Sequence, residues 1–156
     1  MKSDFDPLVG SWRVSHRRLK ERLKGCTDWE EFEGTSTLHH LMDGAGNVDD
    51  NVLHLPSGTY RAASIRAFNP ETGLWAIWWI DGRTPQPRLD PPVVGKFVDG
   101  VGTFECDDTL RGEPIRVRYI WSEIEANSAR WQQAFSPDGG KSWEVNWDMR
   151  FSRTAP

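Results

Sequence analysis

Hydrophobic and polar residues alternate with a period of two along several segments of the chain. The clearest segment is 143–151, where apolar side chains occupy every second position: Trp143, Val145, Trp147, Met149 and Phe151. Residues 115–121 repeat the pattern with Ile115, Val117, Tyr119 and Trp121. Successive side chains of a β-strand point to opposite faces, so this alternation predicts strands with one buried face.

Turn-forming residues separate such segments at fairly regular intervals. The turns are rich in Gly, Pro, Asp and Asn, and they lie at Gly25 and at residues 43–46, 56–58, 69–73, 81–92, 99–100, 111–112, 125–128 and 137–140. Nine turns leave ten candidate strands, a spacing that is typical of an antiparallel meander. We therefore expect an all-β fold, an antiparallel up-and-down β-barrel of about ten strands, forming a single domain over residues 1–156.

Two segments leave alternatives open. Residues 17–24 place Leu19 and Leu23 four apart and end before Gly25, a pattern that also suits a short helix over the barrel mouth. We expect a strand there because the segment continues the strand-like residues 12–16 without a break. Residues 74–80 are apolar on both faces, and one explanation is a homodimer that covers the outer face.

Composition and charge exclude several classes of partner. The chain contains nine Trp, seven Phe and two Tyr, so large aromatic side chains supply most of the core. A formal net charge of −4 offers no basic field for a polyanion, and we expect no nucleic-acid partner. Residues 1–7 contain no apolar leader segment, and no run approaches the roughly 20 apolar residues of a membrane span. We expect a soluble, cytoplasmic protein with no membrane partner, in which Cys26 and Cys106 are free thiols.

Four short motifs resemble a known family. Residues Val9 to Trp12 form V-G-S-W, which resembles the G-x-W motif in the first strand of lipocalins. Three further segments resemble a family of uncharacterised bacterial lipocalin-like (calycin-type) β-barrel domains: D-P-P-V-V-G-K-F at 90–97, A-R-W-Q-Q-A-F-S at 129–136 and N-W-D-M-R-F at 146–151. The resemblance spans nearly the whole chain and implies a lipocalin-like or fatty-acid-binding-like barrel. It implies no particular activity.

The same resemblance suggests how one end of the barrel is closed. In lipocalins a late basic side chain packs across the early Trp, which places a cation over an indole face. Successive turns of an up-and-down barrel alternate between its two ends, so a ten-stranded chain starts and finishes at the same end. We expect Trp12 to be buried at this closed end, against Arg150 or Arg153. We favour Arg150, because Arg153 is close enough to the C-terminus to fray.

Two loops at the opposite, open end carry distinctive sequences. Residues 81–92 contain four prolines and should form a stiff loop at the opening, either a lid or part of the rim. Residues 136–143 match the Asp-box, S-x-D-x-G-x-S-W, of sialidase propellers. One copy in a chain this short cannot form a propeller. We therefore expect a hairpin in which the Asp side chain caps backbone amides.

The candidate ligand site consists of residues that we expect to face the interior near the open end. Strand alternation there mixes polar side chains with aromatic ones, as in barrels that bind small molecules. These residues are His54, Tyr60, Trp79, Tyr119, Trp131, Gln133 and Trp147. They predict that a small hydrophobic or aromatic molecule binds inside the barrel. Alternatively, side chains fill the interior and leave no ligand site, and Gln133 and Tyr119 form a hydrogen bond with each other.

Two other functions remain open. A small barrel enzyme of the isomerase, cyclase or hydratase type would use His54 or Tyr60 as proton donor, and Arg118, although on an outward face, to hold an anionic substrate. A haem-binding barrel would use a single histidine. A metal could also be held by His16, His54 and Asp50, but lone histidines on strands are more often hydrogen-bonded bystanders. We predict no metal site, and the sequence specifies neither a cofactor nor a catalytic residue.

Overall fold

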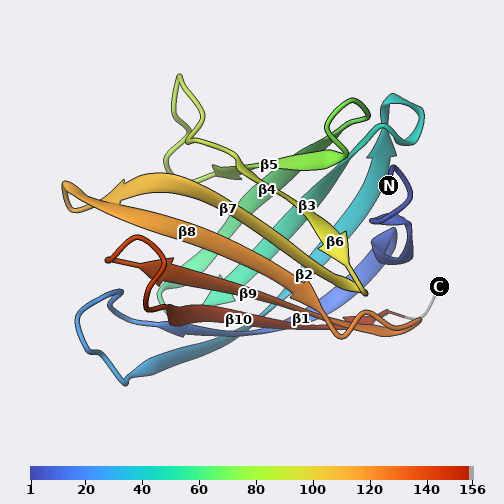
Figure 1. Ribbon diagram of the computed structural model, residues 1–156. Coiled ribbons are helices and arrows are strands. Elements are labelled where there is room, and N and C mark those ends of the chain that lie inside the picture. Colours follow the sequence, from blue (N-terminus) through green and yellow to red (C-terminus); the bar gives the residue numbers. More distant parts are fainter. Residues whose placement is uncertain (155–156) are drawn as a thin grey trace.

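Ten antiparallel strands form one closed β-barrel in the computed structural model, which describes residues 1–154 (Figure 1). The strands are β1 (Gly10–Leu19), β2 (Trp29–Leu41), β3 (Gly46–Leu55), β4 (Gly58–Asn69), β5 (Leu74–Asp81), β6 (Val93–Val98), β7 (Val101–Leu110), β8 (Glu113–Ser122), β9 (Ser128–Ser136) and β10 (Glu144–Arg153). Each strand pairs with its neighbours in sequence, and β1 pairs with β10 to close the sheet. The predicted up-and-down barrel is confirmed. Short 3-10 turns precede β1 (Asp6–Leu8) and β3 (Met42–Gly44).

Strand alternation determines which side chains face the barrel interior. Along β1 every second residue is buried, and the residues between them are exposed. The alternating buried residues are Trp12, Val14, His16 and Arg18, and Leu19, the last residue of the strand, is buried as well. An arginine therefore occupies the last inward position before the open end, in a row that otherwise packs into the core.

The segment predicted as strand over residues 17–24 is strand only as far as Leu19. Residues 20–28 form a loop that is closed by a hydrogen bond from the Lys20 amide to the Asp28 carbonyl (3.0 Å). Positive φ values at Leu23 (57°) and Gly25 (65°) interrupt strand and helix geometry alike. The alternative helix over the mouth is therefore also wrong. Within residues 1–154 no helix has the length and apolar character needed to cross a membrane.

A β-bulge in β10 changes which of its residues face inward. The pairing of β10 with β9 shifts register between Val145 and Trp147. As a result Asn146 and Trp147 are both buried, while Val145 is 38% exposed. The prediction that Val145 shares the inner face of Trp147 is wrong, because a bulge adds one residue and reverses the alternation.

Trp12 and Arg153 meet at the closed end of the barrel, where the chain both enters and leaves the sheet (Figure 1). Trp12 is buried, and its Nε1 donates a hydrogen bond to the Leu8 carbonyl (2.9 Å). Arg153 lies opposite Trp12 in the β1–β10 pairing, with its Cζ 4.1 Å from the centroid of the indole ring. The predicted burial of Trp12 is confirmed, but the choice of Arg150 is wrong. Arg150 is exposed on the outer face, 3.9 Å from Glu123.

Hydrogen bonds hold Arg153 in place despite its position near the C-terminus. Its guanidinium donates to the carbonyls of Pro7 (2.8 Å), Val9 (2.8 Å) and Ala126 (2.9 Å). The same group explains the glycine of the G-x-W motif, because a Cβ on Gly10 would lie 2.6 Å from Arg153 Nη1. Gly10 also has a φ of 124°, which side chains rarely tolerate.

The open end collects the loops between β1 and β2, β3 and β4, β5 and β6, β7 and β8, and β9 and β10 (Figure 1). Strands β5 and β6 pair over only three residues, Trp75 to Ile77 against Val93 to Gly95. The proline-rich loop, residues 82–92, connects these two strands and forms part of the rim rather than a cover over the barrel (Figure 1).

The Asp-box segment forms the predicted hairpin between β9 and β10. Asp138 accepts hydrogen bonds from the Ser136 hydroxyl (2.8 Å) and the Ser142 amide (2.8 Å). The indole Nε1 of Trp143 donates to the Gly140 carbonyl (3.1 Å) and covers the turn. These contacts give the motif a structural role in turn formation.

Candidate functional site

The barrel interior contains two adjoining hollows that share part of their walls. The first, the mouth cavity, lies at the open end and has about 1020 Å³ of empty space, part of it open to solvent. The second, the inner cavity, lies deeper and is much smaller: its cavity volume is about 20 Å³, room for roughly one water molecule, against about 330 Å³ for the mouth cavity. Ile77, Trp79 and Tyr119 line both cavities. An aromatic wall thus extends from the open end into the middle of the barrel.

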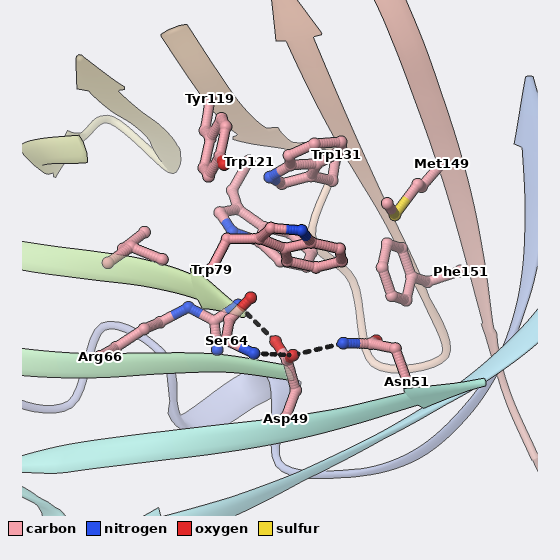
Figure 2. A pocket seen from close by; sticks show the side chains of 11 residues that line it. Asp49, Asn51, Ser64, Arg66, Trp79, Tyr119, Trp121, Trp131, Met149 and Phe151 are labelled. Carbon is pink, nitrogen blue, oxygen red and sulfur yellow. Dashed lines mark hydrogen bonds and ion pairs between the residues drawn. The ribbon is translucent and has the colours of Figure 1, made fainter. Parts of the chain in front are cut away.

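Four aromatic side chains from different strands form that wall. Trp147 of β10 contacts Trp79 of β5 and Trp131 of β9 edge to face, with ring centroids 5.8 and 5.5 Å apart. Tyr119 of β8 packs edge to face on Trp131 at 4.9 Å. Edge-to-face contacts of this kind hold each ring in a defined orientation. In Figure 2, Trp79 lies between the aromatic side chains on one side and a polar group on the other.

The polar group of the inner cavity is built around a buried ion pair. The Arg66 guanidinium contacts Asp49 Oδ2 at 2.5 Å, and both residues are buried. Asp49 Oδ1 accepts hydrogen bonds from the Asn51 amide (2.6 Å) and the Ser64 backbone amide (3.0 Å) (Figure 2). The Arg66 Nη1 donates to Asn47 Oδ1 (2.9 Å). A buried ion pair repays its desolvation only when further hydrogen bonds satisfy its atoms, as they do for this carboxylate.

Two hydrogen-bond donors in the inner cavity have no acceptor. The Nε of Arg66 and the Nε1 of Trp121 are both buried and make no hydrogen bond within residues 1–154. Both residues line the inner cavity, and the Arg66 Cζ lies 5.9 Å from the Trp121 ring centroid. A buried donor without an acceptor costs about 1–3 kcal/mol, so these two groups favour an incoming acceptor.

Three arginine side chains line the mouth cavity. They come from β1, from the loop after β1 and from the loop after β5. Arg18 donates from Nη1 to the Tyr60 hydroxyl (3.2 Å), and its Cζ lies 4.9 Å from the Trp147 ring centroid. Its nearest carboxylate, Glu30, is 4.0 Å away. The Arg83 guanidinium stacks over the Tyr60 ring at 3.7 Å. The Tyr60 ring is thus held by one cation at its hydroxyl and another over its face.

Arg22 adds a second positive charge beside Arg18. Burial, and then the charge of Arg18, lower the pKa of the Arg22 guanidinium below its ordinary value. Arg83, by contrast, pairs with Asp81 at 2.8 Å, and this hydrogen bond raises the pKa of Arg83. The carboxylates of Asp81, Asp90 and Asp108 also line this cavity. Within residues 1–154, Arg18 and Arg22 have no carboxylate closer than 4.0 Å, so an additional anion would be most favourable beside them.

The thiol of Cys106 also lines the mouth cavity. Burial and the neighbouring carboxylates of Asp108 and Asp107 raise its pKa to about 11. The thiol is therefore protonated at neutral pH, and a protonated thiol is a poor nucleophile. Cys106 and Cys26 are both free thiols.

His16 is buried in the barrel wall and is neutral. Its ring stacks on Phe32 with centroids 4.5 Å apart, and its Nδ1 accepts a hydrogen bond from Trp147 Nε1 (3.1 Å). Burial, and to a smaller extent Arg18, lower the pKa of His16 to about 3. The ring therefore acts as a hydrogen-bond acceptor for Trp147 and carries no extra proton near neutral pH.

Six of the seven predicted site residues line the interior. Tyr60, Trp79, Tyr119, Gln133 and Trp147 line the mouth cavity, and Trp79, Tyr119 and Trp131 line the inner one. The amide of Gln133 donates to Asn146 Oδ1 (2.9 Å), so the predicted pairing of Gln133 with Tyr119 is wrong.

His54 is the exception among the predicted residues. It is exposed on the outer face, where its Nδ1 lies 3.1 Å from the Thr59 hydroxyl. Leu53, its neighbour, is fully buried instead. The sequence places apolar residues at 52, 53 and 55, so its pattern does not distinguish the inner from the outer face of β3.

The residues considered as alternatives for a metal site or for catalysis do not converge. Asp50 lies on the outer face with His54 and pairs with Arg61 at 2.7 Å, whereas His16 is inside. Across residues 1–154 no group of three His, Cys, Asp or Glu side chains could hold a metal ion. Arg118 lies on the outer face, with its Cζ 3.7 Å from the Trp143 ring centroid.

Sequence reasoning missed Arg18, Arg66 and Asp49. A signal was present for the two arginines, because each lies an even number of residues from a predicted inward residue on its own strand. Arg18 is six residues after Trp12, and Arg66 is six residues after Tyr60. The burial of Asp49 has no such signal, because it lies an odd number of residues from His54, the residue that the sequence predicted as inward on β3.

No protein-family model and no curated protein matches the sequence. Among solved structures, the barrel is similar to the S-type phycobiliprotein lyase CPES from Guillardia theta. The two superimpose with a TM-score of 0.61 at 9% sequence identity, over 97% of this chain and 91% of the lyase. At this identity the similarity concerns the fold, and the chain therefore shares the lipocalin-like, ten-stranded barrel fold of that lyase.

Proposed function

We propose that this protein binds a small molecule with a hydrophobic or aromatic body inside the barrel. The observation that carries the proposal is the aromatic wall of Trp79, Tyr119, Trp131 and Trp147, which is continuous from the mouth cavity to the inner cavity. A barrel that served only as a scaffold would fill its interior with side chains. Concave, mostly aromatic surfaces with a few polar groups are characteristic of small-molecule sites.

The charges at the mouth support a ligand that also carries an anionic group. Arg18 and Arg22 lie beside each other, and the nearest carboxylate to Arg18 is at the outer limit of an ion pair. A carboxylate on the ligand would contact Arg18 next to the Tyr60 hydroxyl, while the body of the ligand lies against Trp79 and Trp147. Charge-assisted hydrogen bonds of this kind are stronger than neutral ones.

The alternatives have less support from the site. Of the groups named for an isomerase, cyclase or hydratase, only Tyr60 lies inside the barrel. A haem ligand would have to come from His16, whose Nδ1 already accepts a hydrogen bond from Trp147. We therefore propose binding, and keep porphyrins as one class of test ligand.

The test is a titration of tryptophan fluorescence with fatty acids, flavonoids, porphyrins and a linear tetrapyrrole. The tetrapyrrole is included because the similar structure is a phycobiliprotein lyase. Trp79→Leu should weaken binding of the responding ligand by roughly tenfold, the factor that corresponds to about 1.4 kcal/mol. Trp143→Leu is the matched control, because Trp143 packs under Arg118 on the outer face. No response to any of these ligands, or equal weakening by both substitutions, would contradict the proposal.

A further inference from the structure

We infer that the inner cavity contains a subsite for a neutral oxygen acceptor, such as the carbonyl of a ketone, amide or lactam. The inference rests on the proposed function and specifies which chemical group of the ligand enters first. The subsite consists of Arg66 Nε and Trp121 Nε1, the two fully buried donors of the inner cavity that have no acceptor within residues 1–154. It is separate from Arg18 and Arg22, which lie at the mouth.

The Arg66 side chain is buried and held in a fixed orientation by hydrogen bonds. Arg66 is only 3% exposed, and Asn47 and Asp49 hold its two terminal nitrogens at 2.9 and 2.5 Å. These contacts fix the orientation of the guanidinium and leave Nε as the nitrogen without a partner. The Arg66 guanidinium lies over the Trp121 ring, with its Cζ 5.9 Å from the ring centroid, so the two unpartnered donors belong to the same part of the inner cavity. A carbonyl oxygen has two lone pairs with which to accept from such donors.

The local charge determines that the acceptor is neutral. The carboxylate of Asp49 already balances Arg66, and it receives donors from Asn51 and Ser64 besides. A second carboxylate would place two negative charges against one buried guanidinium, and burying an unpaired charge is costly. A carbonyl oxygen satisfies both donors without adding a charge.

The shape of the interior fits a ligand that enters with its carbonyl first. The inner cavity is the smaller of the two, and it adjoins the mouth cavity at Trp79 and Tyr119, which line both. The aromatic body of a ligand would remain against these rings in the wider mouth cavity. Only the leading functional group would reach Arg66 and Trp121.

The experiment compares two ligands that differ by one oxygen, 2-acetylnaphthalene and 2-ethylnaphthalene. Dissociation constants for the full-length protein are measured by tryptophan quenching and by isothermal titration calorimetry. The ketone should bind at least about fivefold more tightly, the factor expected for one ordinary hydrogen bond in a buried site. Trp121→Phe removes one donor and keeps an aromatic ring, so the preference should fall to within about twofold.

Two further variants control the interpretation. Arg66→Lys keeps a positive charge for Asp49 and removes Nε, and it should also reduce the preference for the ketone. Trp143→Phe removes an indole donor on the outer loop and should leave the preference unchanged.

The outcomes separate the two proposals. If both compounds bind the wild-type protein equally, because a water molecule fills the subsite with either ligand, the acceptor subsite is wrong and the proposed function stands. A preference that survives in Trp121→Phe also overturns the subsite. If neither compound binds, and the wider set of ligands fails as well, the proposed function is wrong and the subsite is rejected with it.

Discussion

At the scale of single residues, the burial of His16 makes the free energy of unfolding depend on pH. The ring is stacked on Phe32 and accepts a hydrogen bond from Trp147, and its pKa is lowered to about 3 from the ordinary value of 6.5. Between these two pH values the unfolded chain binds a proton at His16 and the folded protein does not. The free energy of unfolding therefore falls as the pH decreases from 6.5 toward 3.

We predict that His16 alone makes the protein about 2 kcal/mol less stable at pH 5 than at pH 7.5. Urea unfolding of the wild type and of His16→Gln at both pH values measures this contribution, because glutamine accepts from Trp147 but does not titrate. Carboxylates contribute equally to both proteins, so the difference between them isolates the histidine. Identical pH dependence in the two proteins would show that the pKa of His16 is the same in the folded and unfolded states, and would contradict the prediction.

At the scale of elements, Arg153 joins the end of β10 to the beginning of the chain. Its contacts reach the indole of Trp12 and three backbone carbonyls, two of which belong to the segment before β1. Arg150, three residues earlier on the same strand, is exposed and has one carboxylate, Glu123, at 3.9 Å. The two arginines provide a matched pair for testing what closes this end of the barrel.

Arg153→Ala should lower the free energy of unfolding by about 2 kcal/mol, because it removes a cation-π contact and leaves carbonyl groups without a donor. Arg150→Ala should change the free energy of unfolding by less than about 0.5 kcal/mol, because exposed ion pairs contribute little to stability. Urea denaturation midpoints of the two variants, measured side by side, provide the comparison. Equal midpoints would mean that the observed pairing of Arg153 with Trp12 does not stabilise the barrel.

At the scale of the whole molecule, the outer face of β3, β4 and β5 carries an apolar patch. Val48, Ile65 and Trp78 lie in one row across the three strands, and Ala63 pairs with Ile80 in the next. These side chains are half-buried on the outside of the barrel, since their neighbours along each strand line the interior. The homodimer expected from the sequence would use this face, because a second copy of the chain would bury the apolar patch.

We predict concentration-dependent dimerisation that Trp78→Asp abolishes, because a carboxylate in the centre of an apolar interface is left unpaired. Sedimentation velocity over a range of protein concentrations measures the association. Val145→Asp is the control, because Val145 is an exposed apolar residue on β10, outside the patch. A wild-type protein that remains monomeric throughout, or loss of the dimer in both variants, would contradict the prediction.

Local patterns in the sequence were sufficient for the strands, their order and most of the inward residues of the site. The alternation of apolar residues and the spacing of the turns depend only on near neighbours, so they predicted Tyr60, Trp79 and Trp147 as interior residues. The placement of Trp12 at the closed end came from the resemblance to the lipocalin G-x-W motif together with the even number of strands. Where both faces of a strand are apolar, as around His54, alternation carries no information about which face is inside.

Tertiary structure decided the features that depend on pairing between strands. The bulge at Val145 reverses the alternation of β10, and it arises from the register against β9. The ion pair of Arg66 with Asp49 needs the register of β3 against β4, and the choice of Arg153 over Arg150 needs the closure of β1 on β10. Alternation is a property of one strand, whereas register is set by the whole closed sheet, so only the folded barrel determines which polar groups meet inside it.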